Sequence, residues 1–88
     1  MDEVLFSLAF GLEELQRFDK ARQVYFRLIK NFPTSQYVPH AWLSFAEYYF
    51  NEGDMNAASE MYRKVVEYPP DQNPVYGYAV YKMAWAAY

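Results

Sequence analysis

Residues 41–70 read AWLSFAEYYFNEGDMNAASEMYRKVVEYPP. On both sides of the central NEGD, apolar residues recur at steps of three and four, which is the spacing of one helix face and not the alternation of a strand. Gly53 is expected to end the first helix in the left-handed conformation, and Asp54 to cap the second. Helices joined by so short a turn lie antiparallel. The stretch therefore predicts a helical hairpin.

The same spacing continues outward from this hairpin toward both ends of the chain. Predicted helices cover residues 2–16, 21–30, 41–50, 57–66 and 78–88. No segment shows the strict alternation of a half-buried strand, so the predicted fold class is all-α with five helices. Short proline-containing stretches at residues 31–35, 68–71 and 72–74 separate the helices.

Residues around the prolines predict where helices begin. Ser35 is expected to act as an N-cap, and Pro39 can be tolerated only in the first turn of its helix. Asn73 and Pro74 have the pattern of an N-cap followed by proline at the first helical position.

The chain also repeats itself. Three landmarks return after 37 positions: Ala21, Tyr25 and Pro33 recur as Ala58, Tyr62 and Pro70. A third copy begins at Tyr78, where Ala79, Met83 and Ala84 follow Ala41, Phe45 and Ala46 after 38 positions. The chain is therefore two helix pairs and one half-pair.

The order Trp42-x-x-Phe45-Ala46-x-x-Tyr49, Ala58-x-x-x-Tyr62 and Pro70 resembles the tetratricopeptide repeat. The resemblance covers nearly the whole chain, although Ala46 stands where the family often has glycine and the period exceeds the usual 34 residues by three. It implies a right-handed superhelix of antiparallel helix pairs, about two and a half repeats long. Repeat 1 would span residues 2–36, repeat 2 residues 37–73, and the first helix of repeat 3 residues 74–88.

The signature positions have a steric meaning. Alanines are expected where helices of a pair cross closely: Ala9, Ala46 and Ala84 on first helices, and Ala21 and Ala58 on second helices. Large residues such as Tyr25 and Tyr62 are expected to fill the space between pairs.

A second resemblance concerns location. Residues 29–41 and 52–54 look like segments of tetratricopeptide domains in bacterial envelope proteins, including periplasmic cell-division coordinators, outer-membrane assembly lipoproteins and gliding machinery. This resemblance implies a periplasmic or outer-membrane-associated protein, and a cytoplasmic location stays open. The chain ends inside an apolar segment, which indicates a piece of a longer protein.

Composition narrows the function classes. The 88 residues are 53% hydrophobic and 22% aromatic, with ten Tyr, seven Phe and two Trp, so some rings are expected to serve a surface and not the core. A net charge of −3 disfavours nucleic-acid binding through phosphate neutralisation. The absence of Cys excludes disulfides and thiolate sites. No apolar run approaches the roughly 20 residues needed to span a bilayer.

The resemblance places the first helices, residues 2–16, 37–52 and 75–88, on the concave wall of the superhelix. The predicted partner-binding residues on this wall are Phe6, Phe10, Glu13, His40, Leu43, Glu47, Phe50, Asn51, Tyr78, Tyr81, Lys82, Trp85 and Tyr88. Acidic residues gather on these helices, at Glu3, Glu13, Glu14, Glu47 and Glu52, and Lys82 is their one basic residue. An aromatic groove with an acidic rim favours an extended or helical peptide with apolar anchors and basic flanks.

Packing is the competing explanation for several of these rings. Phe10 and Leu43 are expected to pack between neighbouring first helices. Tyr81, Trp85 and Tyr88 lie on an unpaired helix, where they could cover a further repeat or promote self-association.

Catalytic chemistry is not indicated. His40 is the one histidine and is expected to be exposed, the glycines are isolated, and the adjacent Glu13 and Glu14 point in different directions as solvated rim charges. No catalytic, metal or cofactor site is therefore predicted. The sequence favours a non-catalytic protein-interaction scaffold, and the alternative is a purely structural or oligomerisation segment. A role as an accessory region of an enzyme would depend on sequence elsewhere.

Overall fold

The computed structural model describes residues 1–87, apart from the side chains at positions 72, 86 and 87. Its elements are α1 (Asp2–Glu14), α2 (Phe18–Asn31), α3 (Val38–Asn51), α4 (Met55–Val66), a short 3-10 helix η1 (Pro70–Gln72) and α5 (Tyr76–Ala87). The described residues contain no strand, so the predicted all-α fold with five α-helices is confirmed. η1 was not predicted.

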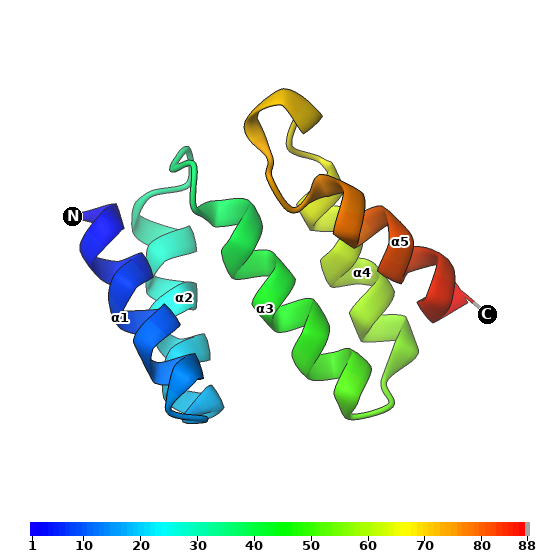
Figure 1. The fold of residues 1–88 in the computed structure, drawn as a ribbon, viewed down its shortest axis with the longest axis horizontal. Coiled ribbons are helices and arrows are strands. Elements are labelled where there is room, and N and C mark those ends of the chain that lie inside the picture. Colours follow the sequence, from blue (N-terminus) through cyan, green and yellow to red (C-terminus); the bar gives the residue numbers. More distant parts are fainter. Residues whose placement is uncertain (88) are drawn as a thin grey trace.

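The helices form a row of antiparallel pairs. Figure 1 shows α1, α3 and α5 running in one direction and α2 and α4 returning in the other, with the two chain ends at opposite sides of the molecule. Each helix packs chiefly on its neighbours along the chain, and the molecule measures 37 × 29 × 19 Å. This arrangement is a short solenoid, in which each pair is stabilised by the pair beside it.

Two small cores lie along the row. The first joins α1, α2 and the start of α3 through the buried residues Ala9, Ala21, Val24, Tyr25, Leu28 and Ala41. The second joins α3, α4 and α5 through Ala46, Ala58, Tyr62, Val65 and Ala79. The second helices therefore contribute to both their own pair and the next one.

The prediction of small residues at helix crossings is confirmed for both complete pairs. Ala9, Ala46, Ala21 and Ala58 are fully buried. Ala84 is exposed. α5 packs on α4, but no second helix of its own pair is among the described residues, so the prediction for Ala84 stays untested.

The turn within the second pair has the predicted chemistry. Gly53 has φ of +84°, and the Asp54 side chain accepts a hydrogen bond from the Ala57 N–H at 3.1 Å. The turn within the first pair differs, because Gln16 adopts a left-handed φ of +60° without being glycine. α1 accordingly ends at Glu14, two residues earlier than predicted, and α2 begins at Phe18, three residues earlier.

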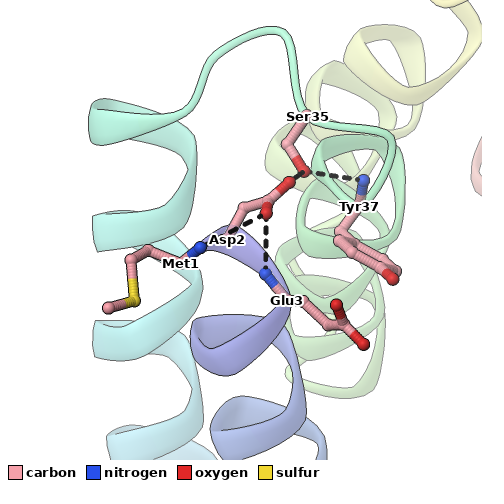
Figure 2. Close-up of polar contacts among 5 residues, drawn as sticks. All are labelled: Met1, Asp2, Glu3, Ser35 and Tyr37. Atoms are coloured by element: carbon pink, nitrogen blue, oxygen red, sulfur yellow. Dashed lines mark hydrogen bonds and ion pairs between the residues drawn. The ribbon is translucent and has the colours of Figure 1, made fainter.

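Ser35 does not cap α3, contrary to prediction. The helix begins at Val38, with Pro39 buried in its first turn as expected. Ser35 Oγ instead accepts a hydrogen bond from the Tyr37 N–H at 3.1 Å and donates one to Asp2 at 2.7 Å (Figure 2). The bond from Ser35 holds the pKa of Asp2 below its ordinary value. The serine therefore ties the α2–α3 loop to the start of α1.

Asn73 also does not act as predicted, because α5 begins at Tyr76. Asn73 is only 4% exposed, and its amide donates to the Val65 carbonyl at 2.7 Å. Its Oδ1 accepts from the Val75 N–H at 3.2 Å. One buried side chain thus satisfies a carbonyl at the end of α4 and shapes the entry to α5.

Candidate functional site

The first-helix face comprises the side chains of α1, α3 and α5 that were predicted to bind a partner, from Phe6 on α1 to Trp85 on α5. Contact between α1 and α3 begins with Phe6, whose ring stacks on Tyr37 with centroids 4.4 Å apart and planes 12° from parallel. Its ring also meets His40 edge-on at 5.1 Å, and it packs against the first core. Phe6 is therefore a packing residue at the α1–α3 junction.

His40 is half-buried, so the prediction of an exposed histidine is wrong. Its ring lies among Phe6, Phe10 and Tyr25, at centroid distances of 5.1, 6.3 and 6.0 Å. Burial lowers the pKa of His40, and the nearby Glu13 carboxylate opposes that shift. The imidazole is held mainly in its neutral form and fills space between the two helices.

Glu13 closes the junction of α1, α2 and α3. Its Oε1 accepts a hydrogen bond from the Tyr25 hydroxyl at 2.6 Å, and its Oε2 accepts one from Ser44 at 2.8 Å. Burial and this carboxylate raise the pKa of Tyr25. The prediction of a solvated rim charge at Glu13 is therefore wrong, because both carboxylate oxygens serve the helix junction.

Glu47 occupies the corresponding junction of α3, α4 and α5. It pairs with Lys82, with Oε2 3.6 Å from the ammonium nitrogen, and both side chains are largely covered. Interaction with the Glu47 carboxylate raises the pKa of Tyr78 to about 12. Burial, and to a smaller extent the Glu47 carboxylate, raises the pKa of Tyr62. The buried Tyr62 hydroxyl makes no hydrogen bond of good geometry with the described residues.

Lys82 also lies over aromatic rings. Its ammonium nitrogen is 3.7 Å from the centroid of Phe50 and 5.9 Å from that of Tyr78. Phe50 and Leu43 both pack against the second core. The packing of Lys82, Phe50 and Leu43 therefore joins α3 to α5. These three predicted site residues present little free surface to a partner.

Four predicted rings do present free surface. The exposed fractions are 44% for Phe10, 47% for Tyr78, 58% for Tyr81 and 57% for Trp85. Tyr81 and Trp85 meet edge-on with centroids 6.2 Å apart. Asn51 is exposed as well. Tyr88, also predicted, lies outside the described residues.

A cleft of about 360 Å³ lies beside the α1–α2 turn and against α3. It brings the predicted residues Glu13, Glu47 and Asn51 together with unpredicted ones, namely Phe18, Asp19, Arg22, Ser44, Tyr48 and Glu52. The Arg22 guanidinium stands 3.5 Å from the centroid of the Tyr48 ring and also pairs with Asp19. No sequence pattern links a residue near the start of α2 to one in the middle of α3, because only packing brings them together.

Metal-ligand groups and membrane-spanning helices were sought among the residues that the structure describes. No group of three or more His, Asp or Glu side chains there could hold a metal ion. None of the described helices has the length and apolar character needed to cross a membrane.

Comparison with known proteins gives a family. Residues 3–35 and residues 39–72 each match a family model described as Tetratricopeptide repeat, and the two segments together cover most of the chain. Neither the curated proteins nor the solved structures gave a match to this chain.

Proposed function

Because this chain belongs to the tetratricopeptide repeat family, we propose that it is a non-catalytic scaffold that holds a segment of a partner protein on its first-helix face. Repeats of this family generally mediate protein–protein interaction, and typically do so without catalysis. The finer assignment, to one face and one kind of partner, rests on the side chains described above.

The main support for this proposal is a set of four exposed aromatic rings. Phe10 on α1 and Tyr78, Tyr81 and Trp85 on α5 remain about half exposed, although the chain has enough aromatic residues to fill its cores. Apolar rings in such positions are a common sign of an interaction surface. Aromatic residues, above all Trp and Tyr, also contribute most of the binding free energy in many interfaces. We expect the partner's apolar anchors to contact these four rings.

The exposed charges of the chain indicate which residues should flank the apolar anchors of the partner segment. Glu3 and Glu14 are exposed on α1, and Glu52 is exposed just after α3. Glu13 and Glu47 are instead engaged inside the helix junctions. Three free carboxylates and a net charge of −3 favour basic residues on either side of the apolar anchors. A peptide with apolar anchors and basic flanks therefore fits this face best, in extended or helical form.

A displayed peptide library would test this proposal. We expect the chain to select sequences that combine aromatic or aliphatic anchors with Lys or Arg. Combined substitution of Phe10, Tyr81 and Trp85 by Ala should weaken the selected peptides by more than about tenfold, because each ring is a potential hot spot. Phe26→Ala is the matched control, since Phe26 is an equally exposed ring on α2, a second helix.

Circular dichroism of each variant must show unchanged helicity before affinities are compared. Equal binding by the triple variant and the Phe26→Ala control would contradict the proposed face. Loss of helicity in the triple variant would show that the rings belong to the core, and would also contradict the proposal.

A structural or oligomerisation role is the second candidate, and a specific observation favours it. Val4 and Leu8 are exposed along one stripe of α1, Leu15 is exposed just after that helix, and Val80 is exposed on α5. Apolar surface at both ends of a solenoid can join copies head to tail. Light scattering over a range of concentrations separates the two functions, because a chain that binds peptide and stays monomeric argues against oligomerisation.

We also propose that the protein works in a bacterial envelope complex concerned with motility, cell division or outer-membrane assembly. This proposal rests on the resemblance of residues 29–41 and 52–54 alone. Fractionation of source cells into cytoplasm, periplasm and membranes, followed by immunodetection, tests it directly. Recovery in the cytoplasm alone would contradict it.

A further inference from the structure

The cleft beside the α1–α2 turn, described above and called the turn cleft from here on, lies inside the row of helices and not at either end of the chain. One wall comes from the end of α1 and the start of α2, and the other from the second half of α3. Its volume of about 360 Å³ is at the lower end of the range of ligand pockets, roughly 300–1,000 Å³. The turn cleft therefore has room for one or two side chains of a partner.

The turn cleft carries more negative than positive charge. It has one basic lining residue, Arg22, and four acidic ones, Glu13, Asp19, Glu47 and Glu52. Arg22 pairs with Asp19, and Lys82 pairs with Glu47. Glu13 accepts hydrogen bonds from neutral hydroxyls, and no described residue forms an ion pair with Glu52. Two negative charges therefore remain unbalanced in this cleft, which favours a cationic ligand.

The turn cleft already accommodates one guanidinium group, that of Arg22. This group lies 3.5 Å from the centroid of the Tyr48 ring and pairs with the Asp19 carboxylate, and the Arg22 side chain is only 17% exposed. A planar cation in contact with a ring face and a carboxylate is favourable, because the ring face is the negative part of its quadrupole and the carboxylate accepts charged hydrogen bonds.

The cleft walls hold a second ring and a second carboxylate, those of Phe18 and Glu52. The Phe18 ring is 51% exposed and belongs to neither of the two cores. Glu52 is exposed as well. Packing within the described residues therefore does not account for these two side chains, and both are free to contact a ligand.

The charge of the turn cleft is not a general feature of the repeat. Packing residues of the chain return after 37 positions, as Tyr25 does in Tyr62. At the same spacing, the charged residues Glu13, Asp19 and Arg22 are replaced by neutral ones, namely Phe50, Asn56 and Ser59. The packing of one helix pair on the next therefore does not require this set of charges, and a ligand is the better explanation for it.

We propose that the turn cleft binds an arginine side chain of the partner segment, with Phe18 and Glu52 in contact with its guanidinium group. Arginine fits better than lysine, because its planar group can stack on a ring and donate two hydrogen bonds to one carboxylate. The inference rests on the proposed partner-binding function and assigns one basic flank of the segment to a place on this chain. The turn cleft borders the first-helix face, since Glu13, Glu47 and Asn51 belong to both.

Small derivatives of amino acids probe the turn cleft before a partner is known. N-acetyl-arginine amide is compared with its lysine counterpart and with the citrulline counterpart, which has nearly the shape of arginine but no charge. Amide chemical shifts of the isotope-labelled chain, at constant ionic strength, locate and measure binding. We expect saturable shifts at residues 18–22 and 44–52, with a dissociation constant on the order of 10–50 mM for arginine. Lysine should bind at least about threefold more weakly, and citrulline should not saturate.

Two variants that remove the same charge provide the decisive comparison. Glu52→Gln should weaken binding of the arginine derivative at least about threefold. Glu52 follows the C-terminus of α3, where the loss of a negative charge does not destabilise the helix. Glu14→Gln is the matched control, because Glu14 is exposed on α1 outside the cleft lining, and it should change the affinity by less than about 1.5-fold. Phe18→Leu should weaken binding about twofold, and circular dichroism verifies that all three variants fold.

Several results would overturn the inference. They are the absence of saturable shifts up to about 100 mM arginine derivative, equal binding of the arginine and citrulline derivatives, or equal binding by Glu52→Gln and Glu14→Gln. Dimerisation that Glu52→Gln abolishes would also overturn it, because the turn cleft would then bind a second copy of the chain.

Failure of this inference can be distinguished from failure of the proposed function. If Glu52→Gln leaves the library-selected peptides unaffected while the combined Phe10, Tyr81 and Trp85 substitution weakens them, the peptide-binding face is supported and the arginine site is wrong. If the arginine derivative saturates the turn cleft while the library selects no peptide, the arginine site is supported and the proposed peptide-binding face is wrong.

Discussion

Glu13 and Glu47 occupy equivalent junctions in this solenoid, yet their partners differ. Glu13 accepts hydrogen bonds from two neutral hydroxyls, those of Tyr25 and Ser44. Glu47 pairs with the charged Lys82, and the equivalent tyrosine, Tyr62, makes no good hydrogen bond.

A comparison of the two junctions shows which groups they have in common. Each junction joins three helices, and in both a carboxylate on the first helix faces a buried tyrosine on the second and a polar side chain on the next first helix. Ser44 and Lys82 occupy the same place in that arrangement, 38 positions apart. Glu13 and Glu47 are only 34 positions apart and so come from different repeat positions, yet each supplies a carboxylate acceptor. The donor on the next first helix changes from hydroxyl to ammonium, so the two junctions should respond differently to substitution, salt and pH.

Removal of the carboxylates should give the largest difference in stability between the two junctions. Glu13→Ala leaves the fully buried Tyr25 hydroxyl and Ser44 without an acceptor, so we expect the free energy of unfolding to fall by about 2–3 kcal/mol. Glu47→Ala should cost only about 1 kcal/mol, because the ion pair is long at 3.6 Å and the Lys82 and Glu47 side chains keep 16% and 28% of their surface exposed, so water can replace the contact. Urea denaturation followed by circular dichroism measures both. Glu13→Gln, which keeps an acceptor, should recover part of the loss, and equal losses at the two sites would show that the junctions are alike.

Removal of the tyrosine hydroxyls should give effects of different size. Tyr25→Phe deletes the hydrogen bond to Glu13 and should lower the free energy of unfolding by about 1–1.5 kcal/mol. Tyr62→Phe deletes a buried hydroxyl that has no good partner, so its effect should stay within about 0.5 kcal/mol or stabilise the chain. The two variants form a matched pair, because both tyrosines are fully buried. A larger loss at Tyr62 would reveal a hydrogen bond to Glu47.

The dependence of stability on salt should differ between the two donors, Lys82 and Ser44. Lys82→Gln is expected to lower the free energy of unfolding by up to about 1 kcal/mol at low ionic strength, and by less in about 1 M salt, where charges are strongly screened. Ser44→Ala should cost about 1 kcal/mol at either ionic strength, because its donor is neutral. Chemical denaturation with urea, which leaves the ionic strength unchanged, is the suitable measurement. A salt-independent Lys82→Gln would mean that its packing over Phe50 matters more than its charge.

Low pH should destabilise the first junction, because it protonates His40. Its pKa is lowered in the folded chain, so its contribution to stability is complete above the ordinary value of 6.5 and is lost as pH falls below it. We expect a decrease of less than about 1 kcal/mol between pH 7.5 and 5.5. The pH dependence of the melting temperature measures it, with His40→Gln as the control. An unchanged slope in that variant would assign the dependence to other groups.

Much of the fold follows from local patterns in the sequence. Helix spacing, the Gly53-Asp54 turn and the buried alanines Ala9 and Ala46 are all set by residues within one or two turns of each other. The boundaries were less accurate where a side chain bonds a distant segment. Ser35 bonds Asp2 and the Tyr37 N–H, and Asn73 bonds the Val65 carbonyl and the Val75 N–H, so each side chain shapes the loop before the helix instead of capping its first turn.

The candidate site was less predictable than the fold. Of the predicted residues, Phe6, Glu13, Leu43, Glu47 and Phe50 serve helix junctions, whereas Phe10, Asn51, Tyr78, Tyr81 and Trp85 keep exposed surface. Helical spacing tells which residues leave the stripe toward the paired helix. It does not tell whether a neighbouring first helix then covers them, because that depends on how closely successive pairs approach.

Short-range spacing and a repeated order of small and large residues were enough to predict five helices, their pairing and the resemblance to the tetratricopeptide repeat. The folded chain was needed to show that Glu13 and Glu47 turn inward, that His40 is half-buried and that Val80 and Ala84 are exposed. Burial and hydrogen bonding depend on three helices meeting at once. No single helix, however clear its periodicity, specifies its neighbours on both sides.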